Sequence, residues 1–345
     1  MKKQLLLIVM ALLPMIASAK EVEIDGINYY IDVEKKTANV AYNGKYTGTQ
    51  IIIPSSILYE GDSYSVIGIN TMAFSNNRDL ISVEIPNSVT SIGGQAFYNC
   101  INLVDIIIPD GVTSVGNQAF DCTQWYYNQE DGVVYAGSVV YKYKGTMPFN
   151  TELVLKEGTT TICNYAFQYC NNLISVTLPN SVTSIGEEAF SGCINLKSIE
   201  ISNSLTKIGQ SAFSGCRGLT SLSFPQSVKT IEGNAFGGCS GLTFIKVYRN
   251  RPIAITDEFD SAFTDVDKET CILYVPKGTA TMYMSAPGWM EFENIVEFEE
   301  ESAINQLDVT SDEDVDWYTL DGRKLEGEPT EKGVYIVNGK KVYVK

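Results

Sequence analysis

The pair Ala-Phe recurs along this chain at a nearly constant spacing. Its alanine stands at positions 73, 96, 119, 166, 189, 212 and 235. Five of the six intervals are 23 residues, and the sixth, across residues 119–166, is 47. A repeat of fixed length in this range indicates a solenoid, in which each turn packs only on its neighbours. The period therefore predicts the architecture before any single residue is considered.

Within one repeat, two strand-like segments precede the Ala-Phe pair. Residues 80–86 alternate apolar and polar side chains up to a proline, as expected for a half-buried strand that the proline ends. A second short β-like segment, 89–92, runs to Gly93, which allows a tight turn. Residues 95–100 resemble one helical turn, in which the alanine lets neighbouring turns approach and the phenylalanine fills the space between layers. The repeat thus predicts short parallel strands with helical turns.

Departures from the repeat divide the chain. A solenoid needs its terminal apolar layers covered, so the divergent ends are expected to be caps rich in β-structure. Between residues 122 and 160 the pattern lapses around Ala136-Gly137-Ser138, which indicates a β-hairpin inside one continuous solenoid. We expect the following segments: 1–19, signal peptide; 20–48, N-terminal β cap; 49–250, solenoid with a hairpin insert near 123–150; 251–298, C-terminal cap; 299–316, acidic linker; 317–345, short β segment.

The first residues have the pattern of an export signal. Lys2 and Lys3 precede a short apolar run, 5–13, and Ala17-Ser18-Ala19 provides small residues at the cleavage position. The apolar run is too short to span a bilayer as an anchor. We therefore expect a secreted or cell-surface protein with a cleaved signal peptide and no integral membrane segment in the mature chain.

Composition excludes several functions. The chain has 41 acidic against 25 basic residues, a formal net charge of −16, which disfavours nucleic acid as a partner. It has no histidine, which removes Ser-His-Asp and Cys-His nucleophiles and every histidine-containing metal site. No Gly-x-x-x-x-Gly-Lys or Gly-x-Ser-x-Gly motif occurs. We predict no catalytic residues, no cofactor and no metal site, so the chain is expected not to be an enzyme; a hydrolase built from paired carboxylates is the remaining catalytic alternative.

The cysteines allow two interpretations. One slot, three residues after the phenylalanine, holds Cys100, Cys170, Cys193, Cys216 and Cys239, while Cys122, Cys163 and Cys271 lie elsewhere. Stacked turns lie roughly 4.8 Å apart, which permits a ladder of disulfides or a metal column in an exported protein. The same slot also suits small buried apolar side chains. Because no Cys-x-x-Cys motif occurs and nothing varies in pairs, the sequence favours free buried thiols.

The repeat, read as Leu-x-Ser-Ile-x-Ile-Pro-x-Ser-Val-Thr-Ser-Ile-Gly-x-x-Ala-Phe-x-x-Cys, resembles the BspA-like, or Treponema-type, leucine-rich repeat over roughly residues 50–250. Residues 131–145 and 273–276 are similar to stretches of surface and secreted repeat proteins of Bacteroidetes, and residues 320–341 to their C-terminal sorting segments. The resemblance implies a right-handed leucine-rich-repeat solenoid with parallel strands on its concave side, used for adhesion.

Two surfaces are candidates for contacting a partner. If the Leu-x-Ser-Ile-x-Ile segments are strands, their third and fifth residues point outward: Ser82, Glu84, Asp105, Ile107, Ser175, Thr177, Ser198, Glu200, Ser221, Ser223, Phe244 and Lys246. These positions form either a contact surface or ordinary solvated strand. The insert offers Trp125, Tyr126 and Tyr127, which either bind a partner or pack the insert onto the solenoid.

The sequence predicts an exported, non-enzymatic binding or adhesion protein that engages an extracellular or host protein, or a polysaccharide, through the solenoid surface. The alternative is a glycan-binding module that uses the aromatic insert.

Export leads to a first testable prediction. Intact-mass spectrometry of the protein recovered from outside the cytoplasm should show a chain that begins at Lys20, because cleavage follows Ala17-Ser18-Ala19. A recovered chain that retains residues 1–19 would contradict the assignment, and the same spectrum shows whether residues 317–345 are kept.

Overall fold

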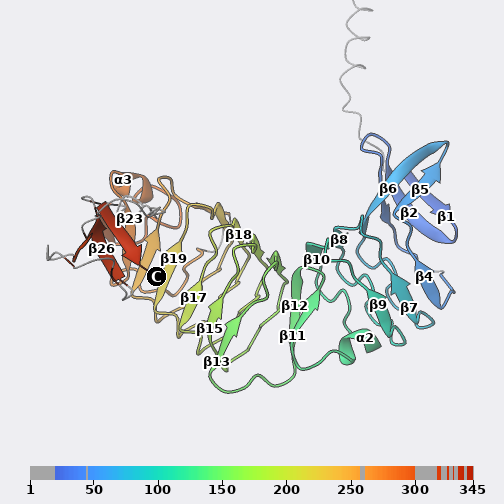
Figure 1. Ribbon diagram of the computed structural model, residues 1–345, viewed down its shortest axis with the longest axis horizontal. Coiled ribbons are helices and arrows are strands. Elements are labelled where there is room, and N and C mark those ends of the chain that lie inside the picture. The colour runs from blue at the N-terminus through green and yellow to red at the C-terminus, as the bar shows by residue number, and fades with distance from the viewer. Residues whose placement is uncertain are drawn as a thin grey trace, which may run out of the picture.

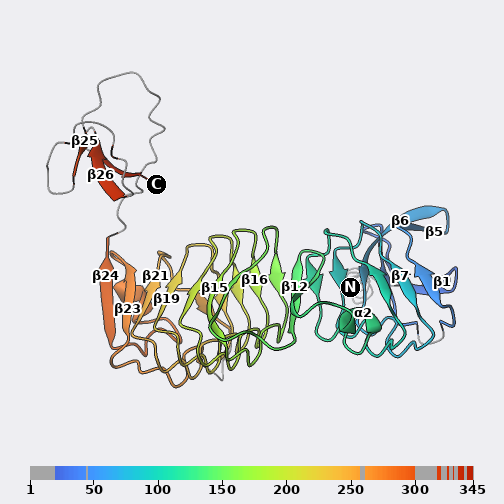
Figure 2. The same ribbon diagram turned by 60° about the horizontal axis from the view of Figure 1, so that its bottom comes forward.

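The structure is a computed structural model, and it describes residues 20–43, 46–256, 261–299, 317–319, 325, 329, 333–337 and 340–344. The expected signal peptide and, apart from Glu299, the expected acidic linker lie outside these residues. From residue 20 to residue 299 the described chain is a β-solenoid whose strands follow one another along the long axis of the molecule (Figures 1 and 2).

The first strand-like segment of each repeat forms strand column 1. Its strands are β4 (Gln50–Ile52), β7 (Ser82–Glu84), β9 (Asp105–Ile107), β13 (Thr151–Val154), β15 (Leu173–Thr177), β17 (Ser198–Glu200), β19 (Ser221–Phe224), β21 (Phe244–Val247), β23 (Ile272–Pro276) and β24 (Asn294–Phe298). They pair in parallel within three sheets, β4-β7-β9, β13-β15-β17 and β19-β21-β23-β24. Val83, Val176 and Leu222 point inward and are buried, so the alternation predicted from sequence is present.

The second segment forms strand column 2. Its strands are β6 (Asp62–Ile69), β8 (Ser91–Ile92), β10 (Ser114–Val115), β12 (Val139–Lys144), β14 (Thr161–Ile162), β16 (Ser184–Ile185), β18 (Lys207–Ile208), β20 (Thr230–Ile231) and β22 (Ala254–Ile255). They belong to two sheets, which contain β6-β8-β10 and β12-β14-β16-β18-β20-β22, and within each sheet neighbours pair in parallel, as Ile185 does with Ile208. Figure 1 shows β8, β10 and β18 on the opposite edge of the solenoid from β9, β13 and β15.

The two ends of the solenoid are covered differently. At the N-terminal end, β1 (Lys20–Ile24), β2 (Ile27–Asp32) and β3 (Thr37–Val40) form an antiparallel meander that joins β6, which also pairs with β5 (Ser56–Tyr59). At the other end, α3 (Ala280–Tyr283) precedes Trp289, whose ring lies 5.2 Å from that of Phe263. The described C-terminal residues form a separate antiparallel sheet of β25 (Trp317–Tyr318), β26 (Gly333–Val337) and β27 (Lys340–Val344).

The insert occupies a turn of the solenoid. After α2 (Gln124–Tyr127), β11 (Gly132–Ala136) and β12 form an antiparallel hairpin. The amide of Ser138 donates to Val112 and its carbonyl accepts from Thr160, so the start of β12 takes one position in strand column 2. Among the described residues no strand fills the matching position in column 1, and β9 and β13 are the end strands of different sheets.

A stack of phenylalanine rings runs through the core. Phe167, Phe190, Phe213 and Phe236 lie nearly parallel, with centroids 5.0, 5.1 and 5.2 Å apart. All four are fully buried. At the insert the rings no longer lie parallel: Tyr141 meets Phe120 edge-on at 5.4 Å, and Tyr143 is tilted against Phe167 at 6.3 Å. The Tyr141 hydroxyl donates to Asp121 at 2.5 Å, and burial with this carboxylate raises the pKa of Tyr141 far above its usual range.

The segment around each Ala-Phe pair is a series of hydrogen-bonded turns, which refines the helical turn expected from sequence. Residues such as Glu188 and Ser211 adopt positive φ angles, 50° and 52°, which interrupt a helical run. Alternate amides therefore bond to the next turn, as Phe190 does to the Ala212 carbonyl at 2.7 Å.

The repeated glycine after the second strand has a different role from the tight turn expected for Gly93. A β-carbon at Gly93 would lie 2.3 Å from the backbone nitrogen of Thr71 in the preceding turn, and one at Gly209 would lie 2.7 Å from that of Glu187. At these two positions, close approach of neighbouring turns, rather than a left-handed backbone, therefore requires glycine.

The cysteines are free thiols, as the sequence favoured. Four of them donate from Sγ to the carbonyl of the phenylalanine in the preceding turn, at 3.0–3.2 Å: Cys100, Cys193, Cys216 and Cys239. Burial raises the pKa of Cys100 and of Cys239 to about 12. The slot therefore holds a small side chain that also satisfies a core carbonyl.

Removal of one stacked ring should destabilise the solenoid. We expect Phe190→Ala to lower the free energy of unfolding by about 3–5 kcal/mol, because a fully buried ring leaves a cavity between two neighbours. Phe149→Ala is the control, since that ring is 80% exposed, and should change stability by less than about 0.5 kcal/mol. Equal urea midpoints for the two variants would contradict the role of the stack.

The thiols give a second prediction for the fold. At pH 8 a thiol reagent should leave Cys100 and Cys239 unmodified in the folded protein, because both are buried and their raised pKa keeps them protonated. In denaturant without reductant all eight cysteines should react. A count of fewer than eight on mass spectrometry would show that disulfides exist.

Candidate partner-binding surface

The outward residues of strand column 1 lie on one face of the solenoid. Parallel pairing aligns Ser82 with Asp105 and Glu84 with Ile107, Ser175 with Ser198 and Thr177 with Glu200, and Ser221 with Phe244 and Ser223 with Lys246. These twelve positions form two rows along the solenoid. The structure therefore aligns the candidate residues of the strands in the order that the repeat predicts.

The two rows are interrupted at the insert. Ser82, Glu84, Asp105 and Ile107 belong to the sheet β4-β7-β9, and the other candidate residues belong to the two sheets that begin with β13. Most positions on both sides carry small or acidic side chains. The interruption is bordered by two exposed apolar side chains, Ile107 at 65% and Val154 at 74%.

Aromatic side chains gather at the C-terminal end of these rows. We call this group the aromatic end and define it as Phe244, Lys246, Tyr248, Tyr274 and Phe298. The ring centroids of Phe244 and Tyr274 are 6.0 Å apart, and those of Tyr248 and Phe298 are 5.5 Å apart. The Lys246 ammonium lies 4.9 Å from the Tyr248 centroid and 4.3 Å from that of Phe298. Two rings therefore hold the cation in place.

Sequence reasoning found Phe244 and Lys246 and missed the other three members of the aromatic end. Parallel pairing places Tyr274 beside Lys246 and Phe298 beside Pro276. Tyr248 had a visible signal, because Phe244, Lys246 and Tyr248 alternate along one strand and its extension. Tyr274 and Phe298 lie in the divergent end, where the 23-residue period no longer assigns a residue to a row.

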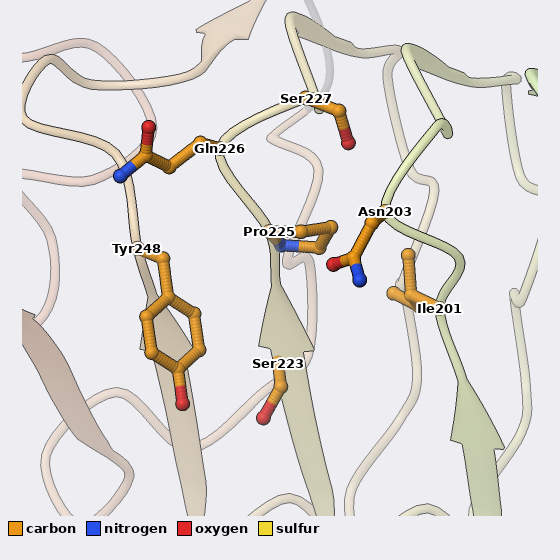
Figure 3. Close-up of a pocket in the computed structure, with 7 residues that line it drawn as sticks. All are labelled: Ile201, Asn203, Ser223, Pro225, Gln226, Ser227 and Tyr248. Atoms are coloured by element: carbon orange, nitrogen blue, oxygen red, sulfur yellow. The ribbon is translucent and has the colours of Figure 1, made fainter. Parts of the chain in front are cut away.

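A cavity of about 490 Å³ adjoins the aromatic end. Its lining is uncharged and consists of Ile201, Asn203, Ser223, Pro225, Gln226, Ser227 and Tyr248. Figure 3 shows Tyr248 on one side of Pro225, with Asn203 and Ile201 on the other. One wall is held by Arg249, whose guanidinium donates to the carbonyls of Gln226 and Val228.

The aromatic residues of the insert mostly pack against the core. Trp125 is half-buried, with its ring 4.8 Å from that of Phe120. Tyr126 meets Tyr141 edge-on at 5.9 Å, and burial raises the pKa of Tyr126 to about 12. Tyr127 is 57% exposed. Of the three candidates in the insert, Tyr127 alone presents most of its ring to solvent.

The described part of the chain lacks two further features, a cluster of metal ligands and a membrane-spanning helix. It contains no group of three or more acidic or cysteine side chains placed to hold a metal ion. Across the same residues, no helix combines the length and the apolar character that crossing a membrane requires.

The repeat places the chain in a known family. The model of the BspA type leucine rich repeat region matches in six copies, over residues 38–129 and 141–268. This chain belongs to the BspA-type leucine-rich-repeat family. No curated protein is similar enough to count as a match.

Several solved structures are similar to this chain. A leucine rich cell surface protein from Faecalibacterium prausnitzii has 20% identity and a TM-score of 0.36, with 83% of this chain and 96% of that chain covered. A leucine-rich repeat protein from Bacteroides ovatus has 25% identity and a TM-score of 0.34, with 80% and 76% covered. A leucine rich repeat protein from T. pallidum has 25% identity and a TM-score of 0.34, with 65% and 91% covered.

The packing of the insert can be tested by two substitutions. Trp125→Ala should lower the free energy of unfolding by about 2–4 kcal/mol, because its half-buried ring contacts Phe120. Tyr127→Ala, the neighbouring control, should cost less than about 0.5 kcal/mol. Equal stability of the two variants, measured by urea denaturation, would show that the Trp125 ring is not part of the core.

Proposed function

We propose that this chain is an exported binding protein without catalytic activity, and that it holds an extracellular protein or a large polymer against the outward face of strand column 1. The observation that carries the proposal is the aromatic end. Most outward positions in the middle of the solenoid are Ser, Thr or Glu, whereas Phe244, Lys246 and Tyr274 break this pattern together. The predicted export signal and the family of the repeat support the same proposal.

The chemistry of the aromatic end suits a contact site. Aromatic rings supply large contact areas at low cost in conformational entropy, and they dominate the binding energy of many interfaces. Lys246 is already held between two rings, so little side-chain freedom is lost when a partner covers it. The hydroxyl-rich rows beyond it add weak contacts along a stiff surface.

Glycan binding by the insert is less well supported than this site. Trp125 and Tyr126 pack against core rings, which leaves Tyr127 as the exposed ring of the three. One exposed ring offers a small platform for a polysaccharide.

The proposal is tested by returning the aromatic end to the repeat pattern. In the double variant Phe244→Ser and Lys246→Ser, the two positions match Ser221 and Ser223 of the preceding turn. Binding of the mature protein to host matrix proteins and polysaccharides is measured by surface plasmon resonance. We expect the dissociation constant for a bound partner to rise about 10-fold or more.

The matched control is Phe149→Ser, which removes an 80% exposed ring outside strand column 1 and should leave binding unchanged. Equal loss in both variants would contradict a site at the aromatic end. If the mature protein binds nothing in the panel, the proposed function itself is wrong.

A further inference from the structure

The cavity beside the aromatic end lies where successive turns carry different residues at one repeat position, just after the strand of column 1. The residue that follows each strand of column 1 by one or two places is Pro179, Ser202, Pro225 and Tyr248 in successive turns. Ser202 turns inward, is 4% exposed, and donates to the Val182 carbonyl at 2.7 Å. A proline ring is thus missing on one side of Pro225, and a tyrosine ring stands on the other. The hollow follows from these two replacements.

One polar atom in this cavity lacks a partner. Ser227 lines the cavity, and its hydroxyl oxygen is buried and makes no hydrogen bond. A buried hydroxyl without a partner costs free energy that a ligand donor or acceptor would recover. Ser181 stands at the same repeat position two turns earlier and is also unpartnered, but it does not line the cavity. Ser181 is therefore a natural control for Ser227.

The charge of the lining selects the kind of ligand. All seven lining residues are uncharged. Of the two adjacent cations, the Arg249 guanidinium is directed to two backbone carbonyls, and the Lys246 ammonium lies against the rings of Tyr248 and Phe298. A phosphate or a carboxylate would find no charged partner in the cavity itself. The lining therefore favours a neutral ligand that offers many hydroxyl groups.

The arrangement of apolar and polar groups narrows the ligand further. Tyr248, Pro225 and Ile201 supply apolar walls, and Asn203, Ser223 and Ser227 supply hydrogen-bonding groups (Figure 3). The Tyr248 ring is fixed by its edge-on contact with Phe298. A pyranose ring has the same division, with apolar C–H faces and a rim of hydroxyls. The hollow, of about 490 Å³, is open to solvent and can admit one ring of a longer chain.

We propose that this cavity binds a sugar ring of a neutral polysaccharide, with Tyr248 as the apolar wall and Ser227, Ser223 and Asn203 as hydrogen-bonding groups. The inference rests on the proposed function and names the ligand class for the cavity that adjoins the aromatic end. Longer chains would also reach the rings of Phe244 and Tyr274, which continue the surface.

The test measures binding of neutral oligosaccharides of glucose, galactose, mannose and xylose to the mature protein by isothermal titration calorimetry. We expect at least one to bind with a dissociation constant between about 10 μM and 2 mM. Ser223→Trp fills the cavity from an exposed strand position and should abolish this binding. Ser227→Ala should weaken it roughly 2- to 10-fold.

Two controls lie outside the cavity. Ser240→Trp places the same bulk at an exposed turn position away from strand column 1, and Ser181→Ala removes the other unpartnered hydroxyl. Both should leave sugar binding unchanged. Circular dichroism melting of all four variants separates loss of binding from loss of fold.

Each outcome decides between the proposals. Sugar binding that persists in Ser223→Trp, or that is lost equally in Ser240→Trp, overturns the cavity as the site. Binding of a matrix protein or an acidic oligogalacturonate but of no neutral oligosaccharide overturns the ligand class and leaves the proposed function intact. Absence of binding to every sugar and every protein overturns both.

Discussion

The contact between one turn and the next is the constraint on which this protein depends. Phe190 donates its amide to Ala212 in the following turn, and its ring stacks 5.1 Å from that of Phe213. The same two contacts are repeated along the core, so each turn must have the same thickness as its neighbours. Where the chain departs from the repeat, the departure must still fill one layer. The insert does so by placing β12 in strand column 2 and Tyr141 against the ring stack.

This constraint separates the positions that build the solenoid from those that are free to vary. Alanine, phenylalanine, glycine and cysteine occupy slots where space or a core carbonyl is limiting, as the Sγ of Cys216 shows by donating to Phe190. The outward rows of strand column 1 carry no such restriction. A cluster such as Phe244, Lys246 and Tyr274 can therefore arise there without disturbing the stack. The free rows are where selection for a partner can act.

Much of the fold could be predicted because the same residue pattern recurs in several turns. Alternation of apolar and polar side chains in one segment is weak evidence for a strand. Its recurrence at a constant period was enough to predict both strand columns and their inward residues. The local backbone was harder to predict: the glycine after Ile208 is required by the backbone of Glu187, which is distant in sequence. The positive φ angles of residues such as Ser211 were also missed, because no glycine marks them. At the site, Tyr274 stands 28 residues after Lys246, so the 23-residue period could not place them side by side.

The sequence by itself determined the solenoid, its repeat length and the face on which outward residues lie, and it favoured free thiols in the shared slot. These follow from local spacing, and each turn depends only on the turns next to it. The tertiary structure decided which residues outside the regular repeat come into contact. It placed Trp125 against Phe120, joined Tyr248 to Phe298, and opened a cavity between Ile201 and Tyr248. Such contacts depend on how far the chain rises and turns between irregular segments, and only the folded coordinates contain that information.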